Sequence, residues 1–235
     1  MSDTLHKELL LALKKHAGHG TKHSGNVAYT GSSHFSYHIS NPIRRGIARN
    51  FLAHHKNVSK KGVVALLNRL YRGKSHEEKS IAGMFLGYSK EHRKQIQPRL
   101  LDEWLDHLEG WAEVDSLSQS NFGADEMLSG WEAWKRTLTR FSKGKNINKQ
   151  RASLVLLTKP VRESRDRRLS TLAFKNIGRL QQEKDIMITK AISWLLRSLI
   201  ENHKREVMNY IQENNSLLPK IAVRETKRKL IMGRK

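Results

Sequence analysis

The sequence predicts an all-α protein built from short antiparallel helices, and three observations carry this prediction. Apolar residues recur at helical spacing along most of the chain, as Leu5, Leu9 and Leu13 do. The chain has only four prolines, and only residues 18–40 depart from a helical pattern. Residues with binding or catalytic chemistry recur at intervals of roughly 40, the repeat length of α-solenoids. We therefore expect one HEAT-like α-solenoid domain over residues 1–235, with helix pairs around a concave basic groove.

The expected helices begin and end at recognisable signals. Asn41-Pro42 places a proline at the first helical position behind a cap. Ser75 and Glu78 have the spacing of a capping box, and Gly18 is expected to end the first helix. Beyond that helix, the patterns predict helices over residues 41–55, 59–70, 75–89, 98–109, 111–119, 123–142, 147–158, 166–180, 185–202, 204–214 and 219–231.

Residues 18–40 are the irregular part of the chain. Phe35, Tyr37 and Ile39 alternate with polar residues, as in a β-strand. We therefore expect a short hairpin or an irregular loop there.

Composition limits the kind of partner. The formal net charge is +22 and the pI is near 10.4, which favours a polyanion. The absence of cysteine excludes disulfides, thiolate metal sites and cysteine nucleophiles. The twelve histidines show no convincing ligand spacing, and no apolar run approaches the ~20 residues that span a bilayer. We expect no metal, no membrane partner and a cytoplasmic monomer, associated with the nucleoid if bacterial.

The charge is unevenly distributed. From Asp102 to Glu132 the chain has nine acidic residues and no Lys or Arg, while the flanking parts carry net charges of +13 and +18. Within this acidic stretch, Trp111 and Asp115 are four residues apart and share a face of any helix that holds both. The alternative is that Trp111 packs in a core and Asp115 caps a short helix over residues 116–120.

A second stripe of binding chemistry lies on the helix expected over residues 185–202. Lys190, Trp194 and Arg197 recur at helical spacing beside an apolar face. An indole between two cations suits a surface that follows a phosphate backbone, although a half-buried tryptophan with solvated cations would look the same. Arg151 follows Asp115 by 36 residues and precedes Trp194 by 43, and Lys227 follows after 33 more. In a solenoid this spacing predicts one shared groove.

These residues carry a resemblance to a known family. Ile188–Arg197, followed by Ile221–Thr226, resembles the C-terminal signature of the AlkD-like DNA alkylation repair family, the HEAT-like alkylpurine DNA glycosylases. Pro42–Arg45 resembles the family's early proline-arginine helix start, Trp111–Asp115 its tryptophan-aspartate pair, and Gln150–Leu154 the segment of its cleft arginine. The match extends from Pro42 onward. It departs at Asn148, where many members have tryptophan, and at residues 18–40, which look more elaborate.

The resemblance implies a monofunctional glycosylase for cationic alkylated purines in double-stranded DNA, without a cofactor. It implies that Asp115, Trp111, Arg151 and Trp194 are the catalytic residues. An alkylated purine is already a good leaving group, so a carboxylate that stabilises the cationic sugar suits this chemistry. The cations expected to contact DNA are Arg44, Arg45, Lys143, Lys145, Lys159, Lys190, Arg197, Arg224, Lys227 and Arg228.

Two other functions fit the same sequence. One is a non-catalytic paralogue that binds damaged or branched DNA through the same groove. The other is a basic repeat scaffold for RNA or protein, for which the presence of Asp115 and Arg151 would be a coincidence. A lyase would need a desolvated lysine nucleophile, which the sequence does not distinguish from its many other lysines.

Overall fold

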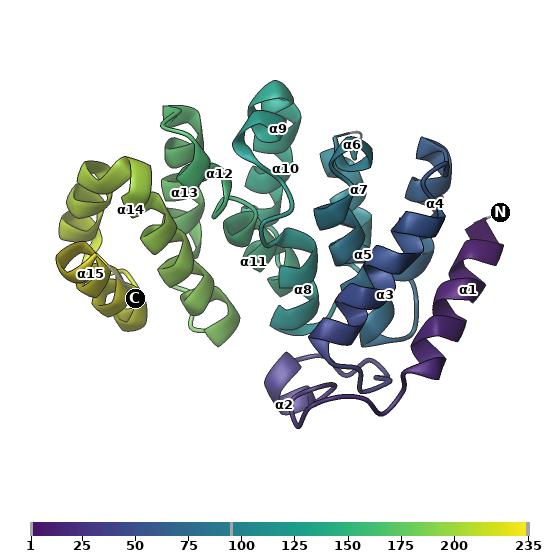
Figure 1. The fold of residues 1–235 in the computed structure, drawn as a ribbon. Helices are drawn as coiled ribbons and strands as arrows, with labels where there is room; N and C mark the ends of the chain where they lie inside the picture. The colour runs from purple at the N-terminus through teal and green to yellow at the C-terminus, as the bar shows by residue number, and fades with distance from the viewer. Residues whose placement is uncertain (1, 95, 234–235) are drawn as a thin grey trace. The chain divides into compact units, whose positions relative to one another are not determined.

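The computed structural model describes residues 2–94 and 96–233, and this part of the chain is helical without any β-strand (Figure 1). It divides into two compact units, which are described separately: unit 1 ends at Leu117 and unit 2 begins at Ser118. The expected all-α fold of paired helices, an α-solenoid, is confirmed. The single domain and the concave groove stay predictions.

Unit 1 arranges its helices in two layers. One layer contains α1, α4 and α7, because α1 packs on α4 and Tyr71 of α4 stacks on Trp104 of α7 at 4.7 Å between ring centroids. The other contains α3, α5 and α8, because α3 packs on α5, and Gly83 of α5 lies against the backbone of Ser116 in α8. The helices of unit 1 are α1 (Ser2–Lys15), α2 (Val27–Thr30), α3 (Asn41–His54), α4 (Lys60–Tyr71), α5 (His76–Tyr88), α6 (Lys90–Arg93), α7 (Pro98–Leu105) and α8 (Gly110–Ser118), which ends one residue past the unit boundary.

Unit 2 repeats this two-layer arrangement. In one layer α10 packs on α13, and Phe174 of α13 stacks on Tyr210 of α14 at 4.7 Å. In the other layer the first half of α14 packs between α11 and α15, and Lys229 of α15 donates to the carbonyl oxygen of Arg197 at 2.9 Å. The helices of unit 2 are α9 (Ala124–Ser129), α10 (Trp131–Lys143), α11 (Ile147–Val155), α12 (Pro160–Glu163), α13 (Arg167–Leu180), α14 (Ile186–Asn214) and α15 (Lys220–Met232).

Most expected helix boundaries are confirmed within a few residues. The capping box is present: the Ser75 hydroxyl accepts from the Glu78 N–H at 3.2 Å, and the Glu78 carboxylate accepts from the Ser75 N–H at 2.9 Å. The expected break between residues 202 and 204 is also present, because His203 has a non-helical backbone (φ −132°, ψ 34°) that kinks α14. The cap of α3 is Ser40 rather than Asn41.

Two expectations about local structure need comment. Of the two alternatives expected for residues 18–40, the irregular loop is present, with the short helix α2 inside it, and the hairpin is not. Phe35 makes only an isolated bridge to Ser75, and the neighbouring backbone N–H groups of Tyr37 and Ile39 bond to the Glu77 carboxylate instead of to a second strand. The single helix expected over residues 123–142 is two helices, since Gly130 interrupts it with φ −111° and ψ 31°.

The contact between α5 and α8 gives a stability prediction. A Cβ atom on Gly83 would lie 2.1 Å from the carbonyl oxygen of Ser116, so Gly83→Ala must push α8 away from α5. We expect a loss of about 1–3 kcal/mol in the free energy of unfolding, the usual cost of overpacking. Gly46→Ala in α3 is the matched control, because nothing lies within 4 Å of its added Cβ. It should stabilise by up to ~1 kcal/mol through helix propensity. Urea unfolding of both variants checks the opposite signs, and equal effects would contradict the close contact.

Candidate functional site

Helix α8 presents the expected tryptophan and aspartate together. Trp111 is half-buried and Asp115 is 7% exposed. Both lie inside the helix, which begins at Gly110, and their spacing places them on the same side of it. Asp115 is therefore an interior helical residue, and the alternative that it caps a helix over residues 116–120 is wrong.

The indole of Trp111 is held by the irregular N-terminal segment. Its Nε1–H donates to the carbonyl oxygen of Tyr29 at 2.5 Å. The two rings meet edge to face, with centroids 5.5 Å apart and planes at 80°. The Tyr29 side chain is half exposed, and the centroid of its ring lies 4.7 Å from that of the His23 ring. Three aromatic rings thus form a row that ends at the helix carrying Asp115.

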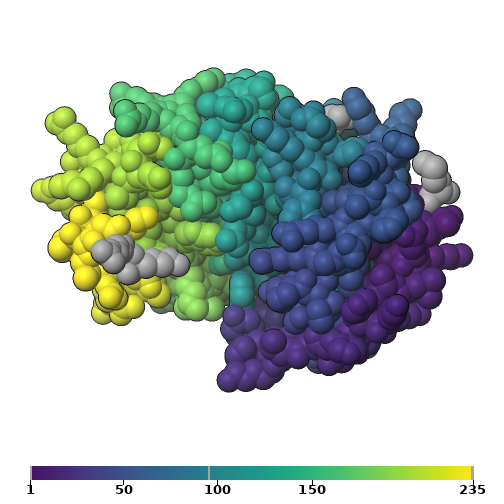
Figure 2. Space-filling view, in the orientation of Figure 1, coloured from purple at the N-terminus to yellow at the C-terminus, as the bar shows by residue number. Residues whose placement is uncertain are grey.

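The segment Tyr29–His34 wraps the first turn of α8, and Figure 2 shows the N-terminal segments of unit 1, drawn in purple, at its surface. Gly31 and Gly110 both have a left-handed backbone, with φ values of +72° and +65°. A Cβ atom on Gly110 would lie 2.3 Å from the carbonyl carbon of Gly31. Because such φ values and this approach of two backbones favour glycine, both residues are needed for the wrap.

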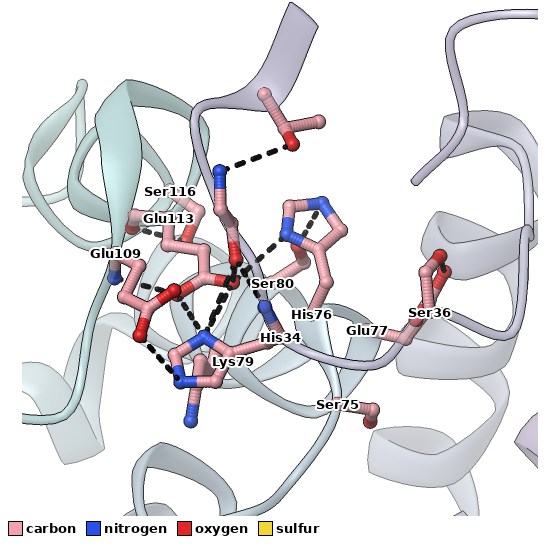
Figure 3. A network of polar contacts seen from close by, with 12 residues as sticks. His34, Ser36, Ser75, His76, Glu77, Lys79, Ser80, Glu109, Glu113 and Ser116 are labelled. Carbon is pink, nitrogen blue, oxygen red and sulfur yellow. Dashed lines mark hydrogen bonds and ion pairs between the residues drawn. The ribbon is translucent and has the colours of Figure 1, made fainter. Parts of the chain in front are cut away.

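A buried carboxylate fixes the other end of this segment. Glu113 is fully buried and accepts hydrogen bonds from the hydroxyl of Ser32 at 2.6 Å and from Nδ1 of His34 at 3.0 Å. It also accepts from Nδ1 of His76 in α5 at 3.1 Å and from the backbone N–H of Glu109 at 2.9 Å. Figure 3 shows both imidazole rings turned toward Glu113. Four donors from three parts of unit 1 therefore converge on one carboxylate.

These donors keep Glu113 charged. Burial by itself would raise the pKa of Glu113, but the hydrogen bonds from His76, Ser32 and the Glu109 N–H hold the pKa below its ordinary value. A second carboxylate helps, since Glu109 accepts from the N–H and the hydroxyl of Ser33 at 2.9 and 2.6 Å. The Ser33 hydroxyl bond is the main reason that the pKa of Glu109 is also lowered. The wrap is thus fixed by two ionised groups.

Arg44 does not have the expected surface position. It is buried, and its Nη1 donates to the hydroxyl of Ser80 at 2.7 Å. The Ser80 hydroxyl lies 3.4 Å from Nε2 of His76, whose Nδ1 bonds to Glu113, so Arg44 belongs to the internal polar network behind α8. We therefore remove Arg44 from the expected phosphate contacts. The neighbouring Arg45 is exposed, as a phosphate contact requires.

In unit 2, Arg151 and Trp194 lie in the same layer. Arg151 is buried in α11, and its guanidinium donates to the carbonyl oxygen of Met187 in α14. This bond connects α11 to the first turn of α14, which carries Lys190 and Trp194 one and two turns later. Lys190 is exposed and Trp194 is half-buried. The expected stripe is therefore present on α14.

The other unit 2 cations expected to contact DNA differ in whether they bond to groups of the protein itself. Arg197 is held by Glu225 of α15 at 3.3 Å and by the carbonyl oxygen of Ser193 at 3.1 Å. Lys159 is also engaged, with the carbonyl oxygen of Ser120 at 3.2 Å. Of the unit 2 cations expected to contact DNA, those exposed besides Lys190 are Lys143 and Lys145 at the α10–α11 turn, and Arg224, Lys227 and Arg228 on α15. These exposed cations suit a polyanion better than Arg197 does.

Lys79 of unit 1 is desolvated, and its role is to hold the end of α4. Lys79 is 1% exposed, and its Nζ donates to the carbonyl oxygens of Tyr71 and Gly73 at 3.0 and 2.6 Å, at the end of α4. Burial lowers its pKa, while the Glu113, Glu78 and Glu109 carboxylates oppose this shift. Because its Nζ is enclosed and occupied by two carbonyl oxygens, Lys79 is unsuited to attack a sugar.

Over residues 2–94 and 96–233, no group of three or more His, Asp or Glu side chains is arranged to hold a metal ion. No helix in the same ranges combines the length and the apolar character needed to cross a membrane.

Sequence reasoning missed Tyr29 and Glu113. Tyr29 contacts Trp111 from a segment 82 residues away, and no local pattern indicates that pairing. Glu113 did have a signal. It stands four residues before Leu117, which is buried, and so lies on the core face of α8.

The fold and this arrangement define an α-solenoid protein with a tryptophan-aspartate helix and a basic surface. The chain matches the family model for the DNA alkylation repair enzymes over residues 11–230, and it therefore belongs to that family. A solved structure described as a predicted DNA alkylation repair enzyme from Enterococcus faecalis shares the fold, with a TM-score of 0.71. That similarity has 17% sequence identity and covers 86% of this chain and 91% of the other. No curated protein matches the chain.

Proposed function

We propose that this repair enzyme is a monofunctional DNA glycosylase that removes cationic alkylated purines, such as 3-methyladenine and 7-methylguanine, from double-stranded DNA in base excision repair. The observation that carries the proposal is the face of α8, where the Asp115 carboxylate lies one turn from an indole that is fixed by Tyr29. Membership of the family supports the DNA substrate.

The proposed reaction is hydrolysis of the N-glycosidic bond. The bond from C1′ to the purine nitrogen breaks, and its electron pair leaves with the base, which becomes neutral. Water then bonds to C1′ and loses a proton. The sugar is oxocarbenium-like at the transition state, and the negative charge of Asp115 stabilises that cation and orients the water. Trp111 and Tyr29, which lie with Asp115 in unit 1, contribute aromatic faces to the same cation.

Arg151 and Trp194 are the proposed catalytic residues of unit 2. The guanidinium of Arg151 braces the first turn of α14 and so helps to set the position of Trp194 on that helix. We propose that the positive charge of Arg151 also holds the DNA phosphate next to the lesion. The proposed phosphate contacts are Arg45, Lys143, Lys145, Lys159, Lys190, Arg197, Arg224, Lys227 and Arg228.

A release assay tests the function. The protein is incubated with methylated duplex DNA, and the free modified bases are separated and quantified. Release of 7-methylguanine or 3-methyladenine above the spontaneous rate supports the glycosylase. Tight binding of the same duplex without release would instead support the non-catalytic paralogue.

The phosphate contacts give a separate prediction. If six or more phosphates are contacted, duplex affinity should fall by roughly 10³-fold or more between 50 and 200 mM salt. Lys190→Ala should weaken binding to all sequences alike, because phosphate contacts position the protein without reading bases. It should also reduce the slope of log affinity against log salt by about 1.

The matched control is Lys175→Ala. Lys175 is exposed on α13, in the other layer of unit 2, so the variant loses the same charge from a different surface. Its affinity and salt slope should stay at the wild-type values. Equal losses in the two variants would show that net charge, and not the α14 stripe, determines binding.

A further inference from the structure

We propose that Glu113 is a positioning residue, which acts through the segment Tyr29–His34 to fix Tyr29 and Trp111 beside Asp115. The inference rests on the proposed function for its effect on excision. Its structural part, the anchoring of the segment and of the indole, stands on the contacts of unit 1 alone.

Glu113 points away from the face of α8 that carries Trp111 and Asp115. Successive helical residues are turned by about 100°, so Glu113, two residues from Trp111 and from Asp115, points to the opposite side of α8. There it is fully buried and has no route to a sugar. Any effect of Glu113 on the reaction must therefore pass through other residues.

Glu113 joins the segment Tyr29–His34 to the interior of unit 1. On one side it accepts from Ser32 and His34, which belong to the wrapping segment. On the other side it accepts from His76 of α5, whose ring is in contact with the Ser80 hydroxyl that Arg44 bonds. Glu113 thus ties the segment to a buried network that includes α3 and α5.

At its other end, the segment contacts the indole of Trp111. Tyr29 accepts from the indole of Trp111 and packs its ring against it, while Gly31 lies against Gly110 in between. The segment therefore passes from the buried face of α8 to the face that carries Trp111. If its end at Glu113 is released, Tyr29 and the indole lose the support that sets their orientation.

The same loop offers a matched control. Glu77 of α5 is also fully buried and holds the next part of the chain, accepting from the Ser36 hydroxyl at 2.9 Å and from the Tyr37 N–H at 3.0 Å. Figure 3 shows Glu77 beside Ser36, apart from the contacts that converge on Glu113. Glu77→Gln should loosen residues 36–39 and leave the segment at Trp111 in place.

The experiment compares Glu113→Gln with Glu77→Gln. For Glu113→Gln we expect cooperative unfolding, faster hydrogen exchange in residues 29–34, and single-turnover excision reduced by about 10- to 100-fold, the effect of small misplacements. Affinity for undamaged duplex should be unchanged. Glu77→Gln should speed exchange in residues 36–39 only and keep wild-type excision. Equal excision in both variants, or a loss of excision in Glu113→Gln without faster exchange at 29–34, would overturn the proposal.

Two further readouts separate positioning from a charge effect. Ser32→Ala removes a donor from the segment only, so its effect on excision should be non-additive with that of Glu113→Gln. The pH profile of excision should keep its shape in Glu113→Gln. A shifted profile would mean that the charge of Glu113 acts directly on Asp115, and would overturn the proposal.

The structural part has a test that needs no activity. With 5-fluorotryptophan incorporated, the Trp111 fluorine resonance, assigned from Trp111→Phe, should shift or broaden in Glu113→Gln and not in Glu77→Gln. If the wild type releases no base, the proposed function fails while this contrast still decides the anchoring. An unchanged resonance in Glu113→Gln would overturn it.

Discussion

Asp115→Asn is expected to reduce excision of 7-methylguanine by about 10²-fold or more, while affinity for undamaged duplex stays the same or rises. Asparagine keeps the shape of the side chain and removes its charge. In the ground state the carboxylate lies beside a polyanion and does not strengthen DNA binding. It stabilises the complex only when the sugar becomes cationic in the transition state. The expected loss is that of one preorganised electrostatic group. Single-turnover release and a binding titration on the same duplexes measure the two effects separately.

The control for this variant is Asp106→Asn, at the exposed end of α7 in the same acidic stretch. It changes the net charge equally and should leave excision unchanged. Trp111→Ala and Trp194→Ala should lose less than Asp115→Asn, because a cation–π contact contributes only about 1–2 kcal/mol. Weaker DNA binding by Asp115→Asn with normal turnover of the bound duplex would contradict an electrostatic role in the transition state.

Helical periodicity predicted the fold because the core is built from apolar residues that recur at helical spacing. Spacing predicts that Val63, Val64, Leu66, Leu67 and Leu70 lie inward in the helix expected from Ser59; in α4 the three leucines are buried and the two valines are half-buried. Local caps were equally informative, as the Ser75 capping box shows. The helix expected over residues 123–142 was wrong because Gly130 breaks it, although an isolated glycine is tolerated inside many helices. Periodicity thus identifies a helix more reliably than it finds a break inside one.

The site was less predictable, because its contacts join distant parts of the chain. The spacing of Trp111 and Asp115 was readable, since both lie on one helix. The contacts that hold α8 were not, because Ser32 is 81 residues from Glu113 and Tyr29 is 82 residues from Trp111. Arg44 was predicted wrongly. As a cation in a basic chain it was expected to bind phosphate, but it is buried and donates to the Ser80 hydroxyl. Composition gives the sign of the partner's charge but does not say which cations meet it.

The charge of the leaving base should determine which lesions are released. We expect 7-methylguanine and 3-methyladenine to be excised, and neutral lesions such as uracil or hypoxanthine to remain in the duplex. The proposed site combines a carboxylate with aromatic faces, which assist the sugar and provide no proton for the base. A neutral base would leave as an anion, so it needs a proton or a hydrogen bond as the bond breaks, and general acid catalysis of that kind typically contributes 10²–10⁴-fold. The site should therefore be effective only when alkylation has already supplied the positive charge.

A matched pair of substrates isolates this effect. The same duplex is prepared with 7-methylguanine and with 7-methyl-7-deazaguanine, which keeps the methyl group and the shape but is neutral. The protein should bind both duplexes with similar affinity and release only the cationic base, leaving an uncleaved abasic strand. Borohydride should trap no covalent adduct, because the buried Lys79 already donates to two carbonyl oxygens and we assign no lysine the role of nucleophile. Release of uracil or of the deaza base at a comparable rate would mean that the protein assists a neutral leaving group with a proton or a hydrogen bond. A trapped adduct would mean that a lysine attacks the sugar. Either result would refute stabilisation of the sugar cation by Asp115 as the mechanism.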